Sequence, residues 1–318
     1  MLHQLHMAGI IPVIKIDNAQ DAVPVCRALA DGGLPVAEIT FRTEAAVEAI
    51  QLVKQQVPDV LLGAGTVLTT AQVDAAIQAG AAFIVSPGFN KKVVLHCLDN
   101  GISVLPGCAS PTEIEMALEL GLEAVKFFPA EALGGTTMIK ALLGPYPQLR
   151  FVPTGGVNEQ NLLDYLIIPQ VLACGGSWMV PQQAVARQDW AQITRLARQA
   201  VDVMLGMALR HIGINHKDAD QADQTARRLA QLMGCERTRD SEISCFVGDG
   251  FEVMKFMGRG QKAHLALAVN HLPRARWHLE RRGFTFDENS LVADEHGQPR
   301  LLYLTEEIAG FAIHLLQK

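Results

Sequence analysis

The chain has 318 residues, of which 49% are hydrophobic and 19% are charged, and its formal net charge at pH 7 is −6. This composition predicts packed domains rather than disorder, and the length allows about two of them. The acidic balance argues against nucleic acid as a partner, and we find neither the ~18-residue apolar run of a membrane span nor a secretion signal. The six scattered cysteines form no CxxC pair, so we expect reduced thiols in a cytoplasmic protein.

Through residue 205, short apolar runs rich in β-branched residues alternate with longer stretches of helical periodicity. The runs that predict strands are Ile10–Ile16, Val36–Thr40, Val60–Gly65, Ala82–Ser86, Ile102–Pro106, Ala124–Phe128, Arg150–Pro153 and Val171–Cys174. The helical stretches include Ala19–Ala30, Glu44–Gln56, Ala71–Ala79, Pro111–Leu120 and the segment from Pro181 to about Leu205. Apolar runs without alternation suit strands that are buried on both faces, so the pattern predicts an α/β fold of the (β/α)8 TIM barrel type. A doubly wound sheet is the alternative, but no GxGxxG follows the first strand.

A lysine, Lys126, lies inside the predicted apolar strand Ala124–Phe128. Burial disfavours a charged ammonium, and a neutral amine can attack a ketone to form an imine. The imine then acts as an electron sink for cleavage of a neighbouring carbon–carbon bond. A single strand lysine more often extends its head group to solvent. In a barrel, however, residues at the carboxyl ends of the strands face the active site, which favours Lys126 as a nucleophile.

Two charged residues end the second predicted strand. Glu38 lies within the strand, and Arg42 lies in the loop that follows it. A carboxylate beside an imine-forming lysine can move protons directly or through water, and a guanidinium can bind a carboxylate through two parallel hydrogen bonds. A purely structural ion pair between Glu38 and Lys126 is the alternative, and it would have the same geometry.

Glycine-containing segments end four of the predicted strands. Gly63–Thr66 and Ser86–Gly88 follow the third and fourth strands, where they are equally typical of plain turns. Thr154–Gly156 and Gly175–Ser177 follow the seventh and eighth strands. Barrel enzymes commonly bind phosphate at these two loops, through backbone N–H groups, so the two glycine pairs predict an anion site.

Six motifs in this order carry a resemblance to a known family: AEITFRTE, GAGTVL, SPG, KFFPAE, PTGG and GGSW. Over about residues 5–205 the chain resembles the 2-keto-3-deoxy-6-phosphogluconate/4-hydroxy-2-oxoglutarate aldolase family. The resemblance implies a class I aldolase for small keto acids that needs no metal and forms a homotrimer, with Lys126 as the Schiff-base lysine and Glu38 as the acid/base. The implied pyruvate site is Arg42, Thr66, Pro87, Phe128 and Thr154, and the implied phosphate site is Gly155, Gly156, Gly176 and Ser177. A sugar-phosphate isomerase or epimerase that uses Glu38 as a base is the alternative, because it needs no imine.

From Gly206 a second pattern begins, and it occurs twice. The first copy predicts strands at Ala208–Asn215, Glu242–Val247 and Phe251–Met257, with a helix at Ala219–Met233. The second copy predicts strands at Ala263–Val269, Phe284–Phe286, Leu301–Leu304 and Phe311–Leu316, with a helix at Pro273–Arg282. Two βαβββ units predict a smaller α+β domain over residues 206–318, after a barrel domain over residues 1–205.

The second domain resembles the vicinal-oxygen-chelate (glyoxalase-like) fold, through HIGI at 211–214 and HLAL at 264–267. In that family each of four strands supplies one metal ligand, and the matching positions are His211, Glu252, His264 and His314. The last position is usually Glu, so His314 is a departure. Such a donor set suits a divalent Zn²⁺, Ni²⁺ or Fe²⁺. The alternative is a binding, sensing or oligomerisation module whose strand histidines hold no metal.

Overall fold

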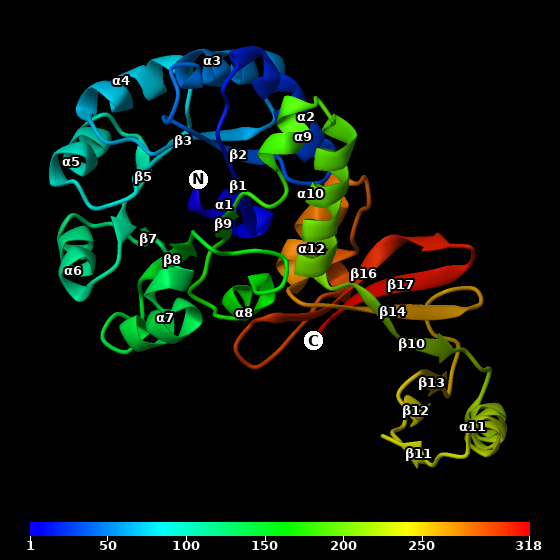
Figure 1. The fold of residues 1–318 in the computed structure, drawn as a ribbon. Helices are drawn as coiled ribbons and strands as arrows, with labels where there is room; N and C mark the ends of the chain where they lie inside the picture. The colour runs from blue at the N-terminus through cyan, green and yellow to red at the C-terminus, as the bar shows by residue number, and fades with distance from the viewer. The chain divides into compact units, whose positions relative to one another are not determined.

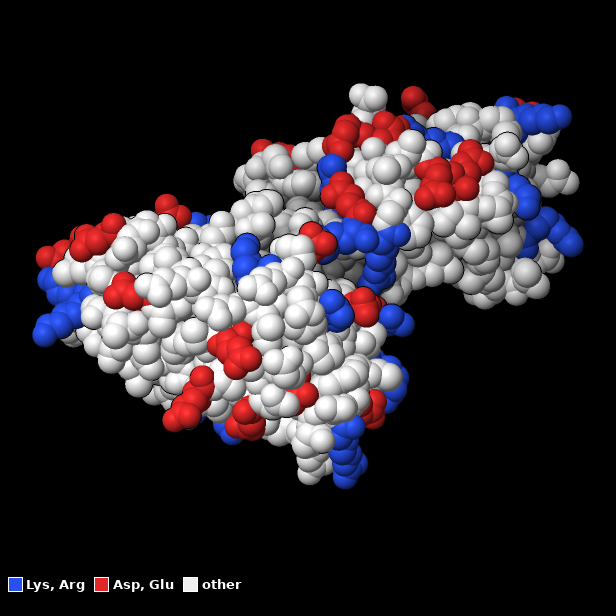
Figure 2. Space-filling model, turned by 90° about the horizontal axis from the view of Figure 1, so that it is seen from above, with Lys and Arg blue, Asp and Glu red and all other residues white.

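The computed structural model describes residues 1–318, which divide into two compact units, Met1–Met204 and Leu205–Lys318. No helix in either unit combines the length and the apolar composition that crossing a bilayer requires. On the face drawn in Figure 2, Lys and Arg side chains are scattered among Asp and Glu side chains on a largely uncharged surface.

The first unit is an α/β fold in which all paired strands run parallel (Figure 1). Its strands are β1 Ile10–Ile14, β2 Val36–Thr40, β3 Leu61–Gly65, β4 Phe83–Val85, β5 Ser103–Leu105, β6 Gly107–Cys108, β7 Ala124–Phe127, β8 Arg150–Pro153 and β9 Cys174–Gly176. One sheet has the order β5-β4-β3-β2-β1-β9 and another the order β6-β7-β8. Only Pro106 separates β5 from β6, and a bridge between Thr154 and Gly175 joins the end of β8 to β9. The strands therefore follow one another in the cyclic order of a (β/α)8-like fold.

Helices connect the successive strands of this unit and lie around the outside of them in Figure 1. They are α1 Leu2–Ala8, η1 Ala19–Asp21, α2 Ala22–Asp31, α3 Ala46–Gln56, α4 Thr70–Ala79, α5 Lys91–Asp99, α6 Pro111–Glu119, η2 Glu131–Leu133, α7 Gly135–Leu143, α8 Leu162–Leu166, α9 Gln182–Ala186 and α10 Trp190–Leu205. Local signals fix where they begin. Thr69 and Gln72 form a capping box at α4, and the Ser110 side chain accepts the N–H of Glu113 at α6. Each of these two helices buries an apolar face, with Val73 and Ala76 in α4 and Ile114 and Ala117 in α6.

Several expected elements of the first unit have different boundaries, and three of the differences have a clear physical reason. The strand expected at Ile102–Pro106 is interrupted at Pro106, which has no N–H to donate to a neighbouring strand. The last strand is Cys174–Gly176 rather than Val171–Cys174, because its glycines pair with β1. The helix expected from Pro181 to about Leu205 is two helices, because Gln188 between them has a positive φ of 54°.

The second unit is built on one eight-stranded mixed sheet with the order β11-β12-β13-β10-β14-β17-β16-β15. Its strands are β10 Ala208–Ile214, β11 Arg237–Thr238, β12 Ser244–Val247, β13 Phe251–Met254, β14 Ala263–Val269, β15 Val292–Ala293, β16 Pro299–Ile308 and β17 Phe311–Gln317; its helices are α11 Ala219–Met233, α12 Leu272–Arg281 and η3 Glu288–Ser290. In each half the first strand runs parallel to the last, β10 with β13 and β14 with β17, and the two first strands pair antiparallel in the middle. The same βαβββ topology thus occurs twice.

Helix α11 packs against β12 and β13 in the first half, where small residues such as Ala222 and Ala226 meet Val247 and Val253.

Two short strands, β11 and β15, were not expected from the sequence. The strand expected at Phe284–Phe286 is reduced to a single bridge between Phe286 and Leu304.

Candidate functional site

Lys126 on β7 and Glu38 on β2 meet in the interior of the first unit. The Lys126 Nζ lies 3.5 Å from Glu38 Oε1, and the two residues are 5% and 3% exposed. Glu38 Oε1 accepts no hydrogen bond from the protein. Because an isolated buried charge is strongly unfavourable, each group stabilises the other in this position. The pair therefore places a buried amine nitrogen next to a carboxylate oxygen that has no other hydrogen-bond partner in the protein.

Glycines make the space around this pair. A Cβ at Gly65, on β3, would overlap the carboxylate of Glu38. Gly107 pairs with Lys126 in the register of β6 and β7, and a Cβ there would overlap the carbonyl oxygen of Pro87. The glycine at the end of the third predicted strand is thus required by close packing, and Pro87 lies beside the strand next to the lysine.

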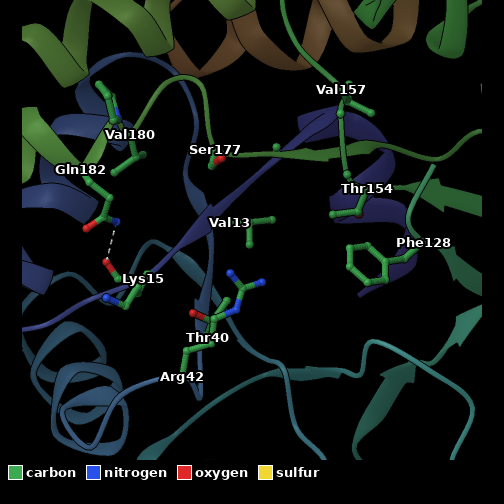
Figure 3. A pocket seen from close by; sticks show the side chains of 14 residues that line it. Val13, Lys15, Thr40, Arg42, Phe128, Thr154, Val157, Ser177, Val180 and Gln182 are labelled. Atoms are coloured by element: carbon green, nitrogen blue, oxygen red, sulfur yellow. Dashed lines mark hydrogen bonds between the residues drawn. The ribbon is translucent and has the colours of Figure 1, made fainter. Parts of the chain in front are cut away.

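Arg42 and Thr66 meet after β2 and β3. The Arg42 Nε donates a hydrogen bond of 3.3 Å to Thr66 Oγ1. Thr66 has a φ of 57°, in the left-handed region that β-branched residues rarely adopt. In Figure 3 the Arg42 guanidinium extends below Val13 into the pocket, where it can meet an anionic group.

A cavity of about 350 Å³ lies at this end of the fold (Figure 3). Seven of the residues expected from the sequence line it, namely Arg42, Phe128, Thr154, Gly155, Gly156, Gly176 and Ser177. Glu38, Thr66, Pro87 and Lys126 are not among its lining residues. The link to the buried pair is Phe128, whose ring lies 5.2 Å from the Lys126 Nζ.

Lys15 and Gln182 also line the cavity, and sequence reasoning missed both of them. The Gln182 Nε2 donates to the Lys15 carbonyl oxygen at 3.1 Å, and the Lys15 Nζ lies 2.7 Å from Asp17 (Figure 3). Lys15 follows Val13 by two residues, so both residues lie on the same side of the extended chain. The rule that identified Lys126, a lysine inside a predicted apolar strand, would have identified Lys15 as well, because Lys15 lies within the predicted strand Ile10–Ile16.

The two expected phosphate loops border the same cavity. Gly155 and Gly156 have φ values of 97° and 84°, which require glycine. Gly176 ends β9, and its lack of a side chain lets the Trp178 ring pack directly against the backbone. The cavity thus has backbone-rich walls on one side and the Phe128 ring on another.

In the second unit, the four residues expected as metal ligands are brought together. They lie on four neighbouring strands, His211 on β10, Glu252 on β13, His264 on β14 and His314 on β17. One ring nitrogen of each histidine lies within 4.8 Å of the others, and all three histidines are buried. Glu252 Oε2 lies 3.2 Å from His211 Nε2 and 3.1 Å from His264 Nε2.

The charge state of this cluster follows from its burial. Burial alone would raise the pKa of Glu252, but hydrogen bonds with His211, His264 and Ser244 outweigh it, and the pKa is lowered. Burial, with the nearby His264 and His211, lowers the pKa of His314 to about 3. Neither ring nitrogen of His314 has a hydrogen-bond partner. A neutral imidazole beside an ionised carboxylate is the ligand form that divalent metals bind.

Two solved structures that resemble the first unit are aldolases. The KDPG aldolase of Legionella pneumophila, with pyruvate captured as a covalent carbinolamine intermediate, is 41% identical with a TM-score of 0.61, covering 63% of this chain and 98% of that one. The 2-keto-3-deoxy-6-phosphogluconate aldolase of Zymomonas mobilis ZM4 is 40% identical with a TM-score of 0.60, covering 63% and 94%. The first unit is therefore an aldolase, a carbon–carbon lyase of (β/α)8-like fold.

Comparisons of the sequence with known proteins identify the family. The model for the KDPG and KHG aldolases matches residues 1–196. The 2-dehydro-3-deoxy-phosphogluconate aldolase of Treponema pallidum is 54% identical over 200 residues, which are 63% of this chain and 95% of the relative. That of Haemophilus influenzae is 51% identical over 204 residues, 64% and 96% respectively. The chain belongs to the KDPG and KHG aldolase family, and residues 197–318 lie outside the family match.

Proposed function

We propose that this chain is a class I aldolase that cleaves 2-keto-3-deoxy-6-phosphogluconate to pyruvate and glyceraldehyde 3-phosphate. The observation that carries the proposal is the buried Lys126–Glu38 pair, 3.5 Å apart, beside Phe128, whose ring lies 5.2 Å from the Lys126 Nζ and lines the cavity. The substrate names of the two curated relatives and the pyruvate carbinolamine of the Legionella enzyme support the same chemistry.

The cycle begins when the Lys126 amine attacks C2 of the keto acid, and loss of water from the carbinolamine gives the imine. Glu38, directly or through water, takes the proton of the C4 hydroxyl. The C3–C4 bond breaks, its electron pair moves into the imine to give an enamine, and glyceraldehyde 3-phosphate leaves. The enamine takes a proton at C3, and hydrolysis releases pyruvate and the free amine. Arg42 and Thr154 hold the keto-acid end, and Gly155, Gly156, Gly176 and Ser177 hold the phosphate through backbone N–H groups.

The same residues support a second substrate that has no phosphate. Cleavage of 4-hydroxy-2-oxoglutarate to pyruvate and glyoxylate uses the imine and the proton acceptor but not the phosphate loops. The Escherichia coli relative, 42% identical over 193 residues, is named a KHG/KDPG aldolase. The two substrates together separate the chemistry at Lys126 from recognition of the phosphate.

Replacing Lys126 by methionine tests the proposal. We expect Lys126→Met to lower kcat/KM for pyruvate release by at least about 10⁴-fold, because the nucleophile is lost. Lys140→Met, on α7, is the matched control and should match the wild type. An isomerase or epimerase that uses Glu38 as a base would keep most of its turnover in Lys126→Met, and that result would overturn the aldolase proposal.

For the second unit we propose a vicinal-oxygen-chelate (glyoxalase-like) domain that binds a divalent metal through His211, Glu252, His264 and His314. The repeated βαβββ topology, with one ligand on each of four neighbouring strands, supports it. Three imidazoles and one carboxylate fit Zn²⁺, Ni²⁺ or Fe²⁺, and a metal bound there would supply a Lewis acid. Ser244 Oγ donates to Glu252 Oε1 at 2.7 Å, which directs Oε2 toward the histidines.

The aldol reaction of the first unit needs no metal under this proposal, so the two sites work independently. We also propose that the chain assembles as a homotrimer, as its family resemblance implies. Light scattering on the full-length protein tests the assembly. A mass near that of one 34.5 kDa chain would contradict it.

A further inference from the structure

The loop after β8, Thr154–Val157, borders the cavity, and protein donors hold its carbonyl groups. The Ala130 N–H donates to the Thr154 oxygen at 2.8 Å, and the Glu131 N–H donates to the Gly155 oxygen at 3.0 Å. The loop after β7 is thus joined to the loop after β8 by two main-chain hydrogen bonds.

The next carbonyl, that of Gly156, is held by two side-chain amides. Asn158 Nδ2 and Asn161 Nδ2 each donate to it at 3.1 Å. In a planar trans peptide the N–H points away from the C=O. Because the Gly155 and Gly156 oxygens face these donors, the N–H groups of Gly156 and Val157 point the opposite way. This arrangement suits an anion that accepts hydrogen bonds from main-chain N–H groups.

Glu131 holds this loop with its side chain as well as its main chain. A Cβ at Gly156 would lie 2.5 Å from the Glu131 Cγ, so the glycine packs directly on the glutamate. The Tyr165 hydroxyl donates to Glu131 Oε1. Gly135, with a φ of 58°, also lies against Glu131, because a Cβ there would lie 3.1 Å from the Glu131 Oε1 and 3.0 Å from the Tyr165 hydroxyl. The Glu131 side chain is therefore fixed by contacts on three sides.

Tyr165, on α8, is fully buried. Burial raises the pKa of its phenol, and the hydrogen bond to Glu131 adds to the effect. The hydroxyl therefore stays protonated and remains a donor. Neither Tyr165 nor Glu131 lines the cavity, so any effect of the two residues on a bound anion passes through the loop.

We propose that Tyr165 and Glu131 are positioning residues that orient the Gly155–Gly156 loop to bind the phosphate of the substrate. The inference rests on the proposed aldolase function and assigns to this pair a share of substrate selection. Because Gly155 and Gly156 are assigned to the phosphate end of the substrate, loss of the pair weakens binding of phosphorylated substrate and leaves the chemistry at Lys126 unchanged.

Steady-state kinetics on two substrates test this proposal. We expect Tyr165→Phe to raise KM for 2-keto-3-deoxy-6-phosphogluconate about 10-fold, in the range found for residues that orient a binding group, with kcat within about 2-fold. Cleavage of 4-hydroxy-2-oxoglutarate should be unchanged. Tyr146→Phe is the matched control, since it removes a similar hydrogen bond, of 2.9 Å to Glu115, at an exposed position. It should behave as wild type on both substrates.

Variants at Glu131 provide a rescue test. Glu131→Gln keeps an oxygen that accepts from the Tyr165 hydroxyl and should retain KM near the wild-type value, whereas Glu131→Ala should raise it for the phosphorylated substrate alone. An unchanged KM in Tyr165→Phe, or an equal loss on both substrates, would overturn the proposal even if the melting temperature falls. If Glu131→Ala does not fold, the KM values of Tyr165→Phe on the two substrates still test the proposal. A wild-type protein that cleaves neither substrate would instead overturn the aldolase function itself.

Discussion

Each of the two units has one carboxylate in its candidate site, buried in the case of Glu38 and partly buried in the case of Glu252, and the groups around that carboxylate differ. Glu38 faces a single amine, Lys126, from a strand that is not its neighbour. Glu252 contacts two imidazoles, and a third lies close by, all on neighbouring strands of one sheet. A closed parallel fold thus brings together residues from opposite sides, whereas a sheet provides one ligand from each strand. Under the two functions proposed above, an amine beside the carboxylate serves covalent chemistry and imidazoles beside it serve metal binding.

Among the changes to the two carboxylate sites other than loss of Lys126 itself, the largest expected effect concerns Glu38 in the first unit. Glu38→Gln keeps the shape of the side chain but removes the proton acceptor, so kcat for aldol cleavage should fall about 10²–10⁴-fold. Stopped assays of pyruvate release measure the effect. Glu123→Gln, which alters an exposed carboxylate paired with Arg150, should match the wild type. A kcat near the wild-type value in Glu38→Gln would assign the Glu38–Lys126 pair a purely structural role.

The corresponding change in the second unit should weaken binding of a divalent metal and leave the rate of aldol cleavage unchanged. His264→Ala removes one ligand, and its Kd for Zn²⁺ in calorimetry should rise on the order of 100-fold or more. Aldol cleavage should be the same with chelator and with metal. His296→Ala, at an exposed histidine, serves as control. Metal stoichiometry near zero in wild-type protein after metal supplementation would contradict the proposed metal site.

A variant at Gly65 tests whether the position of the Glu38 carboxylate depends on close packing. In Gly65→Ala the new methyl group would overlap the Glu38 carboxylate and displace it, so kcat should fall about 10–100-fold. Gly250→Ala is the control, because a Cβ at that position meets no atom within 4 Å. Equal activity of the two variants would show that the position of Glu38 is not critical.

The smallest expected effect concerns acid stability of the metal-free second unit. The pKa of His314 falls from an ordinary 6.5 to about 3 in the folded state, so between these values the unfolded chain binds more protons. Stability is therefore complete above pH 6.5 and decreases as pH falls, by up to about 30-fold in the folding equilibrium at pH 5. Hydrogen exchange of β17 peptides, corrected for intrinsic rates, measures this loss. His314→Gln should make the exchange protection of β17 less dependent on pH. Wild-type protection that does not fall on acidification would contradict the prediction.

Much of the first unit could be predicted from the sequence, because buried parallel strands are continuous apolar runs and their carboxyl ends carry the polar residues. Lys126, Glu38 and Arg42 were found in this way. The contacts of Gln182 with Lys15 could not be found, because these residues are 167 positions apart and meet only when the fold closes. Gly65 and Gly176 look like turn residues in the sequence, but they make space for the side chains of Glu38 and Trp178.

In the second unit the candidate ligand positions came from the resemblance to the glyoxalase-like fold, and the structure places those four residues on neighbouring strands. The two-residue strands β11 and β15 are too short to have a pattern of their own, and only pairing with longer neighbours defines them. The role of Tyr165 was also beyond the sequence, because it depends on how one glutamate is fixed between two glycines and a helix.

The central claim is that the Lys126 amine forms a covalent imine with a keto acid. Incubation of the full-length protein with pyruvate and borohydride, followed by peptide mass mapping, tests it most directly. We predict one reduced pyruvate adduct per chain, on Lys126, and none in Lys126→Met. An adduct on another lysine such as Lys15, or no adduct in protein that actively releases pyruvate, would contradict the account.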